Sequence, residues 1–232
     1  MTRITLVMPY YDNHQMLVEH YRLIGELPKE IKEQVEVVIV DDGSPTHPAG
    51  KADIGVPLQI FRIKVDIRWN QDAARNIGVR YARTQWVLLT DIDHIVPRGT
   101  WSSLVGKEWD PLKVYSFARV SAPDNEPYKP HPNSWFLTRT LFDKVGGYDE
   151  RFAGYYGTDG DFKVRLLAQA AEWIQLKETL IRVPRHVIPD ASTTRYERKE
   201  PGDRPNVDRL RHARDRIGDK IMRYRFPYVR IL

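Results

Sequence analysis

Short apolar runs alternate with segments of helical periodicity along the first hundred residues, and this alternation constrains the fold more than any other feature. Apolar positions spaced three and four apart predict helices over 14–31 and 70–85. The order strand, helix, strand, strand, helix, strand is typical of an α/β domain, with a mostly parallel sheet flanked by helices. The runs that predict the strands are RITLVMP (3–9), VEVVIV (35–40), PLQIFRI (57–63) and WVLL (86–89).

The chain changes character from about residue 101. A long stretch over 122–162 is rich in proline, glycine and aromatic residues, which favours a loop-rich binding surface around one short helix. We expect regular structure on either side of it. The predicted elements are a strand over 113–121, a helix over 160–175, an extended segment over 179–189 and a basic amphipathic helix over 205–225.

Composition excludes several classes of site. The 232 residues are 41% hydrophobic and 29% charged, as in an ordinary soluble domain with or without an appendage. The chain has no cysteine, so disulfides, zinc–thiolate centres and cysteine nucleophiles are absent. The longest apolar runs are too short for a membrane span, and the one before Pro9 is too short for a secretory signal. We therefore expect a cytoplasmic protein.

Four acidic or polar clusters each follow an apolar or loop segment: Tyr10–Asn13, Asp41–Ser44, Asp91–Asp93 and Thr158–Asp161. Carboxyl ends of parallel strands meet at one edge of a sheet, so the first three clusters should converge on one crevice. Crowded carboxylates raise each other's pKa unless a cation lies between them. The paired aspartates of the third cluster suit a hard divalent ion, Mg²⁺ or Mn²⁺, although a solvated turn is the alternative.

The motifs VVIVDDGS, NQDAARNIGVRYA, WVLLTDID and GGYDERFAGYYGTDGDF resemble, in order and spacing, those of glycosyltransferase family 2, whose members have the GT-A fold. The resemblance covers residues 3–186, and its last part is similar to the Gly-Trp-Gly-Gly-Glu-Asp region of the β-1,4-galactosyltransferases. It implies metal-dependent transfer of a sugar from a nucleoside-diphosphate sugar, most simply a UDP-sugar, to an acceptor hydroxyl with inversion. Mn²⁺ or Mg²⁺ would be the cofactor.

The same resemblance implies a role for individual residues. Thr158 stands where the galactosyltransferase-like motif has Glu, which leaves open whether Asp159 or Asp161 is the catalytic base. Asp161 could instead cap the helix that follows it. The residues implied to bind the nucleotide sugar are Pro9, Tyr10, Tyr11, Asp41, Asp42, Arg75, Asp91 and Asp93, and those implied to bind the metal are Asp93, Asp91 and His186.

Three regions follow from these expectations: a nucleotide-sugar-binding half over 1–100, an acceptor-binding and catalytic half over 101–190, and a basic tail over 191–232. Residues 192–232 hold 12 Lys and Arg against 6 Asp and Glu. This excess favours an anionic acceptor or neighbour, namely nucleic acid, a polyprenyl phosphate at a membrane surface, or a polysaccharide. A solvated helix is the alternative. Candidate stacking surfaces for the acceptor are Tyr128, His131, Trp135, Tyr155 and Tyr156.

Two other functions compete with glycosyl transfer. The run LLTDIDHIV also resembles the nucleophile motif of haloacid-dehalogenase-type phosphatases, but here the acidic pair Asp41–Asp42 lies upstream of it rather than downstream. A non-catalytic sugar- or nucleotide-binding module would keep the fold and lose Asp93 or the later acidic cluster, and both are present. Nucleotidyltransferases of related fold need a glycine-rich N-terminal loop, which VMPYYDNH lacks.

Overall fold

A computed structural model describes residues 1–192 and 200–232, and ten strands of that part form one mixed sheet. The strand order across the sheet is β10-β3-β2-β1-β4-β8-β6-β9-β5, with β7 paired to β6. The strands are β1 (Ile4–Tyr10), β2 (Val35–Asp41), β3 (Leu58–Ile63), β4 (Trp86–Leu89), β5 (His94–Ile95), β6 (Val114–Ser121), β7 (Glu126–Tyr128), β8 (Trp135–Thr138), β9 (Trp173–Arg182) and β10 (Tyr228–Arg230).

The N-terminal half of the sheet is parallel, as the alternation of strands and helices predicts. Strand β1 pairs in parallel with both β2 and β4, and β2 pairs in parallel with β3. The other half is mixed, because β8 runs antiparallel to β4 and β6 while β6 and β9 run parallel. The predicted α/β fold is confirmed.

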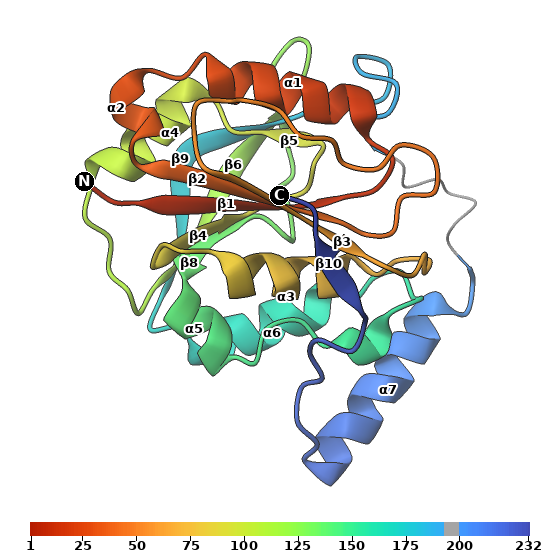
Figure 1. Cartoon of the computed structure of the whole chain (residues 1–232). Coiled ribbons are helices and arrows are strands. Elements are labelled where there is room, and N and C mark those ends of the chain that lie inside the picture. Colours follow the sequence, from red (N-terminus) through yellow and green to blue (C-terminus); the bar gives the residue numbers. More distant parts are fainter. Residues whose placement is uncertain (193–199) are drawn as a thin grey trace.

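Helices cover both faces of the sheet, and each face has its own apolar core. In Figure 1, α1, α2 and α4 lie above the sheet and α3, α5 and α6 lie below it. Neighbouring residues of one strand enter different cores, as with Val37 and Val38 of β2. The helices are α1 (His14–Gly25), α2 (Lys29–Lys32), α3 (Gln71–Tyr81), α4 (Arg98–Gly106), α5 (Arg139–Lys144), the 3₁₀ turn η1 (Glu150–Phe152), α6 (Asp159–Gln169) and α7 (Asp203–Ile217).

Several predicted boundaries are wrong. The helix expected over 14–31 is interrupted before Pro28, because proline disfavours a helical conformation at the preceding residue. The helix expected over 160–175 ends at Gln169, and Trp173 starts β9, which pairs with β6. Pro9 does not stop β1, because the ladder with β4 has ended at Val7, two residues earlier. A missing N–H at Pro9 therefore breaks no bond to β4.

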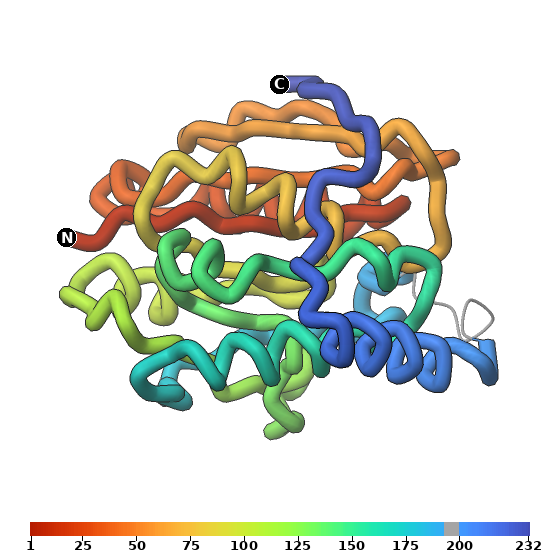
Figure 2. The backbone as a smooth tube through the Cα atoms, turned by 90° about the horizontal axis from the view of Figure 1, so that it is seen from below, coloured from red at the N-terminus to blue at the C-terminus, as the bar shows by residue number. Residues whose placement is uncertain are grey.

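The basic tail returns to the sheet rather than extending away from it. Helix α7 ends at Ile217, with Gly218 as its C-cap, rather than near residue 225, and β10 then pairs antiparallel with β3. Figure 2 shows the blue tail running from α7 across one face to the edge of the sheet. Buried Glu150 holds this crossing, because its carboxylate accepts the backbone N–H groups of Tyr224 and Arg225, each at 2.7 Å. No helix in the described residues is long and apolar enough to cross a membrane.

Candidate active site

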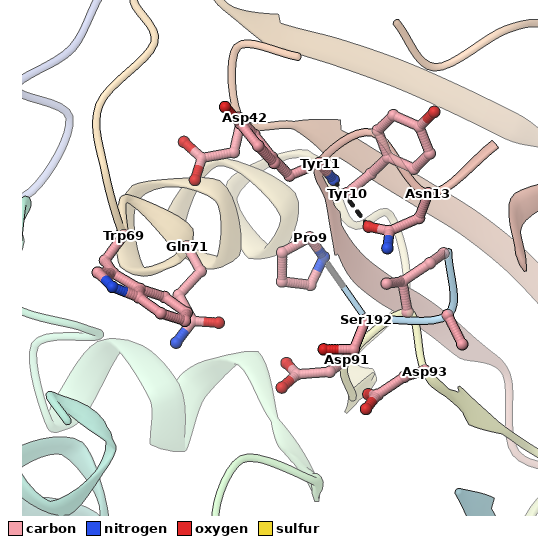
Figure 3. A pocket seen from close by; sticks show the side chains of 12 residues that line it. Pro9, Tyr10, Tyr11, Asn13, Asp42, Trp69, Gln71, Asp91, Asp93 and Ser192 are labelled. Carbon is pink, nitrogen blue, oxygen red and sulfur yellow. Dashed lines mark hydrogen bonds between the residues drawn. The ribbon is translucent and has the colours of Figure 1, made fainter. Parts of the chain in front are cut away.

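A pocket lies at the carboxyl edge of the parallel strands (Figure 3). Its volume is about 590 Å³, open mouth included. Asp42 approaches it from the end of β2, and Asp91 and Asp93 from the segment after β4. Three of the four predicted clusters thus meet in one crevice, as the parallel topology requires. The lining residues are Pro9, Tyr10, Tyr11, Asn13, Asp42, Trp69, Gln71, Asp91, Ile92, Asp93, Ala191 and Ser192.

The two aspartates at the end of β2 have different surroundings. Asp42 lines the pocket and accepts the backbone N–H of Asn70 at 3.2 Å. Asp41 turns away and accepts the N–H groups of Ser44 at 2.7 Å and Ala49 at 3.0 Å, which shapes the following loop. Gly43 has φ +80°, and a Cβ there would lie 2.4 Å from the carbonyl oxygen of Val65. The Asp-Asp-Gly sequence therefore aims one carboxylate into the pocket and uses the other to hold the loop.

The two tyrosines after β1 are both fixed by their hydroxyl groups. Tyr10 is 1% exposed and donates to the carbonyl oxygen of His47 at 2.5 Å. Tyr11 donates to the Asp66 carboxylate at 3.0 Å, while its backbone N–H donates to Asn13, as the dashed line in Figure 3 marks. Tyr11 is the more open of the two to the pocket.

Arg75 lies on α3 directly beneath the paired aspartates and is completely buried. Its guanidinium pairs with Asp91 and lies 5.1 Å from the ring centre of Tyr148. Burial opposes ionisation of Asp91, but Arg75 and then His131 outweigh it, so the pKa of Asp91 lies below its ordinary value. Asp91 is therefore a carboxylate at neutral pH, paired with an arginine of the helix below.

Asp93 takes part in a second set of side-chain contacts, with His94 and, through it, Arg119. His94 shares a 2.7 Å hydrogen bond between its Nδ1 and Asp93, and Arg119 donates to its Nε2 at 2.9 Å. Nε2 therefore accepts, and Nδ1 carries the proton that it donates to Asp93. Burial lowers the pKa of His94 and keeps this imidazole neutral. The ring of His131 is tilted against that of His94, with 4.1 Å between ring centres, and His131 approaches Asp91 at 3.3 Å.

The donor set around Asp91 and Asp93 fits a hard divalent cation. Both side chains line the pocket and are 25% and 21% exposed. Figure 3 shows the two carboxylates side by side below Pro9 and Ser192. Within residues 1–192 and 200–232, no group of three histidine or acidic side chains is arranged to hold a metal. Bound phosphates and water would complete the coordination of such an ion, as is usual for Mg²⁺.

His186, the third predicted metal ligand, is not brought to this pair. It lies exposed in the turn after β9, five residues before Ala191, and unlike Ala191 and Ser192 it does not line the pocket. The next carboxylate, Asp190, has a structural role, because it accepts the N–H groups of Gln15 and Met16 at the start of α1. This contact draws the segment after β9 over the pocket.

Asp159, the predicted base, lies beside the pocket at the first residue of α6. Its Oδ1 accepts a 2.5 Å hydrogen bond from Asn133 and a longer one, at 3.5 Å, from Gln71, which itself lines the pocket. The side chain is partly exposed. The carboxylate of Asp159 therefore lies within reach of a residue that lines the pocket.

The predicted helix cap at Asp161 is wrong. The N-cap of α6 is Thr158, and in the described residues no side-chain bond caps this helix. Asp161 is 4% exposed and binds Arg214 of α7 at 2.7 Å and Arg165 at 2.8 Å. The carboxylate turns toward α7 because the two arginines outweigh the cost of its burial, and they hold the pKa of Asp161 below its ordinary value.

The model of the family described as glycosyl transferase family 2 matches residues 5–168 of this sequence. The chain belongs to glycosyltransferase family 2. The match contains the strand-end aspartates, Arg75 and Asp159, and it stops before β9 and the basic tail. It decides against the haloacid-dehalogenase alternative. No curated protein sequence matches the chain.

Solved glycosyltransferase structures share the fold of this family 2 chain. The structure of S. aureus TarS 1–349 in complex with UDP-GlcNAc is 15% identical, covers 90% of this chain and superposes with a TM-score of 0.66. The mannosyltransferase PcManGT from Pyrobaculum calidifontis, with GDP-Man and Mn²⁺, is 19% identical over 78% of the chain with a TM-score of 0.59. The chain spans 65% of the first and 56% of the second.

A third solved structure, GalNAc-T7 with UDP, GalNAc and Mn²⁺, is 13% identical over 79% of the family 2 chain, with a TM-score of 0.59. The chain spans 44% of that protein. At identities this low the three likenesses establish the fold.

Several site residues of the family 2 chain carry little sequence signal. Trp69 lines the pocket, contacts Tyr156 at 4.8 Å between ring centres and has a left-handed φ of +57°. Asn133 donates to Asp159 and His94 is hydrogen-bonded to Asp93. Trp135, an expected acceptor surface, is instead 1% exposed, because β8 lies in the middle of the sheet. Of the aromatic candidates, Tyr128 and Tyr156 are exposed.

Proposed function

We propose that this chain is a metal-dependent glycosyltransferase that moves a hexosyl group from a nucleoside-diphosphate sugar to an acceptor hydroxyl. One observation carries the proposal: Asp42, Asp91 and Asp93 converge on a single pocket at the carboxyl edge of the parallel strands, with Arg75 buried beneath Asp91. Family membership and the fold of the neighbours support it. The preferred donor is UDP-linked, in keeping with the UDP-GlcNAc of the TarS structure.

The donor would lie with its nucleoside between Tyr11 and Asp42 and its diphosphate over Asp91 and Asp93. These two carboxylates would hold Mn²⁺ or Mg²⁺, which neutralises charge on the diphosphate as it leaves. Arg75 keeps Asp91 ionised and fixes its orientation from below. Neutral His94 fixes Asp93 in the same way through its Nδ1–H group. Trp69, which lines the pocket and contacts the ring of Tyr156, would form an apolar wall beside the donor.

The transfer step needs one base. The oxygen of the acceptor hydroxyl attacks the anomeric carbon, its proton passes to the carboxylate of Asp159, and the bond to the diphosphate oxygen breaks with its electron pair on the leaving group. Asn133 donates to Asp159 and orients it for this role. A single displacement inverts the anomeric carbon. Asp161 does not share the role, because both its oxygens are bound to arginines.

The acceptor is proposed to be anionic. The segment after β9 reaches the pocket at Ser192, and the basic tail follows it in sequence. Exposed Arg209 and Arg216 border a groove on the outer side of α7 and would contact such an acceptor. The resemblance of residues 146–162 to the β-1,4-galactosyltransferase motif supports placing the acceptor hydroxyl near Asp159. Nucleic acid, polyprenyl phosphate and polysaccharide satisfy this chemistry.

The test is hydrolysis and transfer of a panel of UDP- and GDP-sugars, with and without Mn²⁺. We expect activity that chelation abolishes and that Mn²⁺ or Mg²⁺ restores. Asp93→Ala should lower turnover by at least about 100-fold, since one of two proposed ligands is lost. Glu30→Gln, which alters an exposed carboxylate on α2, is the matched control and should behave as the wild type. Full activity without divalent ions would contradict metal dependence. Donor binding without turnover would indicate a non-catalytic module.

A further inference from the structure

Helix α7 lies beyond the residues that match the family, yet it is bound to the pocket-bearing part of the chain by charged contacts that are largely buried. The family match ends at residue 168, and α7 begins at Asp203. Two of its side chains, Asp203 and Arg214, are 3% and 4% exposed. Charged side chains are rarely buried so far unless a partner requires them. Arg68, the partner of Asp203, directly precedes Trp69 of the pocket wall. Asp161, the partner of Arg214, lies two residues after Asp159, which borders the pocket.

The first contact joins Arg214 to α6. Its Nη2 lies 2.7 Å from Asp161 Oδ1, its Nη1 lies 3.1 Å from Oδ2, and Nη1 also donates to Asp149 at 3.0 Å. A two-pronged contact of this kind fixes direction as well as distance, because the guanidinium is planar. Asp161 stands in the first turn of α6, two residues after Asp159. Arg214 thus holds the turn that carries the proposed base.

The second contact joins Asp203, the first residue of α7, to Arg68. The guanidinium donates to both carboxylate oxygens, at 2.7 Å and 3.0 Å. Arg68 directly precedes Trp69 in the pocket wall, and the carbonyl oxygen of Trp69 accepts the Gly154 N–H at 3.2 Å. Trp69 has a left-handed φ of +57°, a conformation that persists only where the surroundings impose it. The Arg68–Asp203 pair is one such constraint.

We propose that α7 braces the pocket from outside, with Arg214 as a positioning residue for Asp159 and Asp203 as a positioning residue for Trp69. The inference rests on the proposed function, since Asp159 is the base of that reaction. Neither residue lines the pocket. The two contacts act on different parts of the site, so their loss should affect different kinetic constants: Arg214 acts on the base and hence on turnover, whereas Asp203 acts on the donor wall and hence on donor affinity.

The experiment measures hydrolysis of the UDP- or GDP-sugar that the wild type turns over best, with Mn²⁺, at a temperature well below every variant's Tm. Arg214→Gln should lower kcat by about 10- to 100-fold and leave the donor Kd nearly unchanged, because small displacements of a catalytic group cost rate. Arg214→Lys should recover part of the loss. Asp203→Asn should instead weaken donor binding several-fold, roughly the effect of a loosened binding wall, with kcat nearly kept.

The matched controls come from a surface ion pair on the same helix. Arg211 and Asp208 lie 2.9 Å apart and are 33% and 42% exposed. Arg211→Gln and Asp208→Asn make the same chemical changes and should leave kcat and Kd unchanged, since exposed pairs contribute little. Melting curves of all variants separate lost positioning from lost folding.

The outcomes separate this inference from the function on which it rests. Unchanged kcat per folded molecule in Arg214→Gln, with an active wild type, overturns the role of Arg214 and leaves the proposed function intact. An equal loss in Arg211→Gln attributes the effect to net charge and also overturns the inference. A wild type that neither binds nor hydrolyses any nucleotide sugar overturns the proposed function, and the inference with it.

Discussion

At the scale of residues, environment rather than residue type separates the roles of the aspartates. Asp41 and Asp42 are adjacent in sequence, but one holds a loop and the other lines the pocket. Asp159 and Asp161 lie in one helical turn, yet only Asp159 keeps a partly exposed carboxylate beside the pocket. The backbone N–H groups of Ser44 and Ala49 account for the first difference, and the arginines that bind Asp161 account for the second.

Asp159→Asn tests the proposed base. The amide keeps the size of the side chain and cannot accept the acceptor's proton, so turnover should fall by about 10²- to 10⁴-fold. Donor affinity should stay within about twofold, because the base acts on the acceptor. Single-turnover kinetics and nucleotide-sugar titration give the two numbers. An unchanged rate would assign the proton to another group.

Asp72 gives a prediction for stability against pH. Burial raises the pKa of Asp72 to about 7, even though Arg75 opposes the shift. An unfolded aspartate titrates at about 3.9. Between these values the folded state holds a proton that the unfolded state has released, so Asp72 lowers the free energy of unfolding as pH rises.

Asp72→Asn removes that titration. Between pH 5 and pH 8 the variant should therefore gain stability relative to the wild type, by roughly 1.4 kcal/mol per pH unit up to about pH 7, above which the gain stops. Chemical denaturation at the two pH values measures the difference. A difference that is constant with pH would mean that Asp72 is ionised in the folded protein throughout this range.

At the scale of elements, α3 places Arg75 because it lies unusually close to β1. Gly78 makes this approach possible: a Cβ at that position would lie 2.3 Å from Cγ1 of Val7. The burial of α3 agrees with this close packing, since eight of its residues are buried, including Arg75, Asp72 and Asn76. The helix works as a buried scaffold beneath the pocket.

Gly78→Ala should therefore destabilise the fold by about 1–3 kcal/mol, because the strand and helix must separate. Gly99→Ala in α4 is the control, since nothing lies within 4 Å of its added Cβ. We expect Gly99→Ala to be neutral or to stabilise by up to about 1 kcal/mol. Denaturant unfolding of both variants measures the contrast. Equal effects would show that the close packing of α3 on β1 is not limiting.

At the scale of the whole molecule, the tail closes the sheet and is part of the fold. Strand β10 covers the edge of β3, and buried Glu150 and Asp149 hold the segment that leads to it. The Arg214–Asp161 pair joins α7 to α6. A helix merely appended to the domain would make no such contacts. Part of the tail's net charge of +6 is therefore paired with acidic residues inside the protein.

Acid should loosen this assembly at the tail first. Burial raises the pKa of Asp161, but Arg214 and Arg165 outweigh it, and the folded pKa lies below the unfolded value. The stability that Asp161 contributes is thus complete above about pH 4 and is lost as pH falls through the folded pKa. Hydrogen exchange of α7 amides at falling pH measures the effect. Asp161→Asn should show faster exchange already at neutral pH and a weaker dependence on acid.

The sequence determined the parallel half of the sheet, the family and the convergence of the strand-end aspartates. These follow from local periodicity and from the rule that parallel strands end at one edge. It also indicated Arg75, because the helix that carries it precedes the Asp-Ile-Asp strand. Tyr11 and Asp159 lie in clusters that the sequence also indicated, but only the family motifs implied their roles, which stay predictions.

Tertiary structure decided the rest. The end of α6 depends on the pairing of β9 with β6, and the return of the tail to the sheet depends on the pairing of β10 with β3, both between strands far apart in sequence. The partners of Asp161 and Asp93 are Arg214 and Arg119, at separations of 53 and 26 residues, the second acting through His94. No local pattern encodes such pairs, because burial and charge pairing depend on which elements pack together.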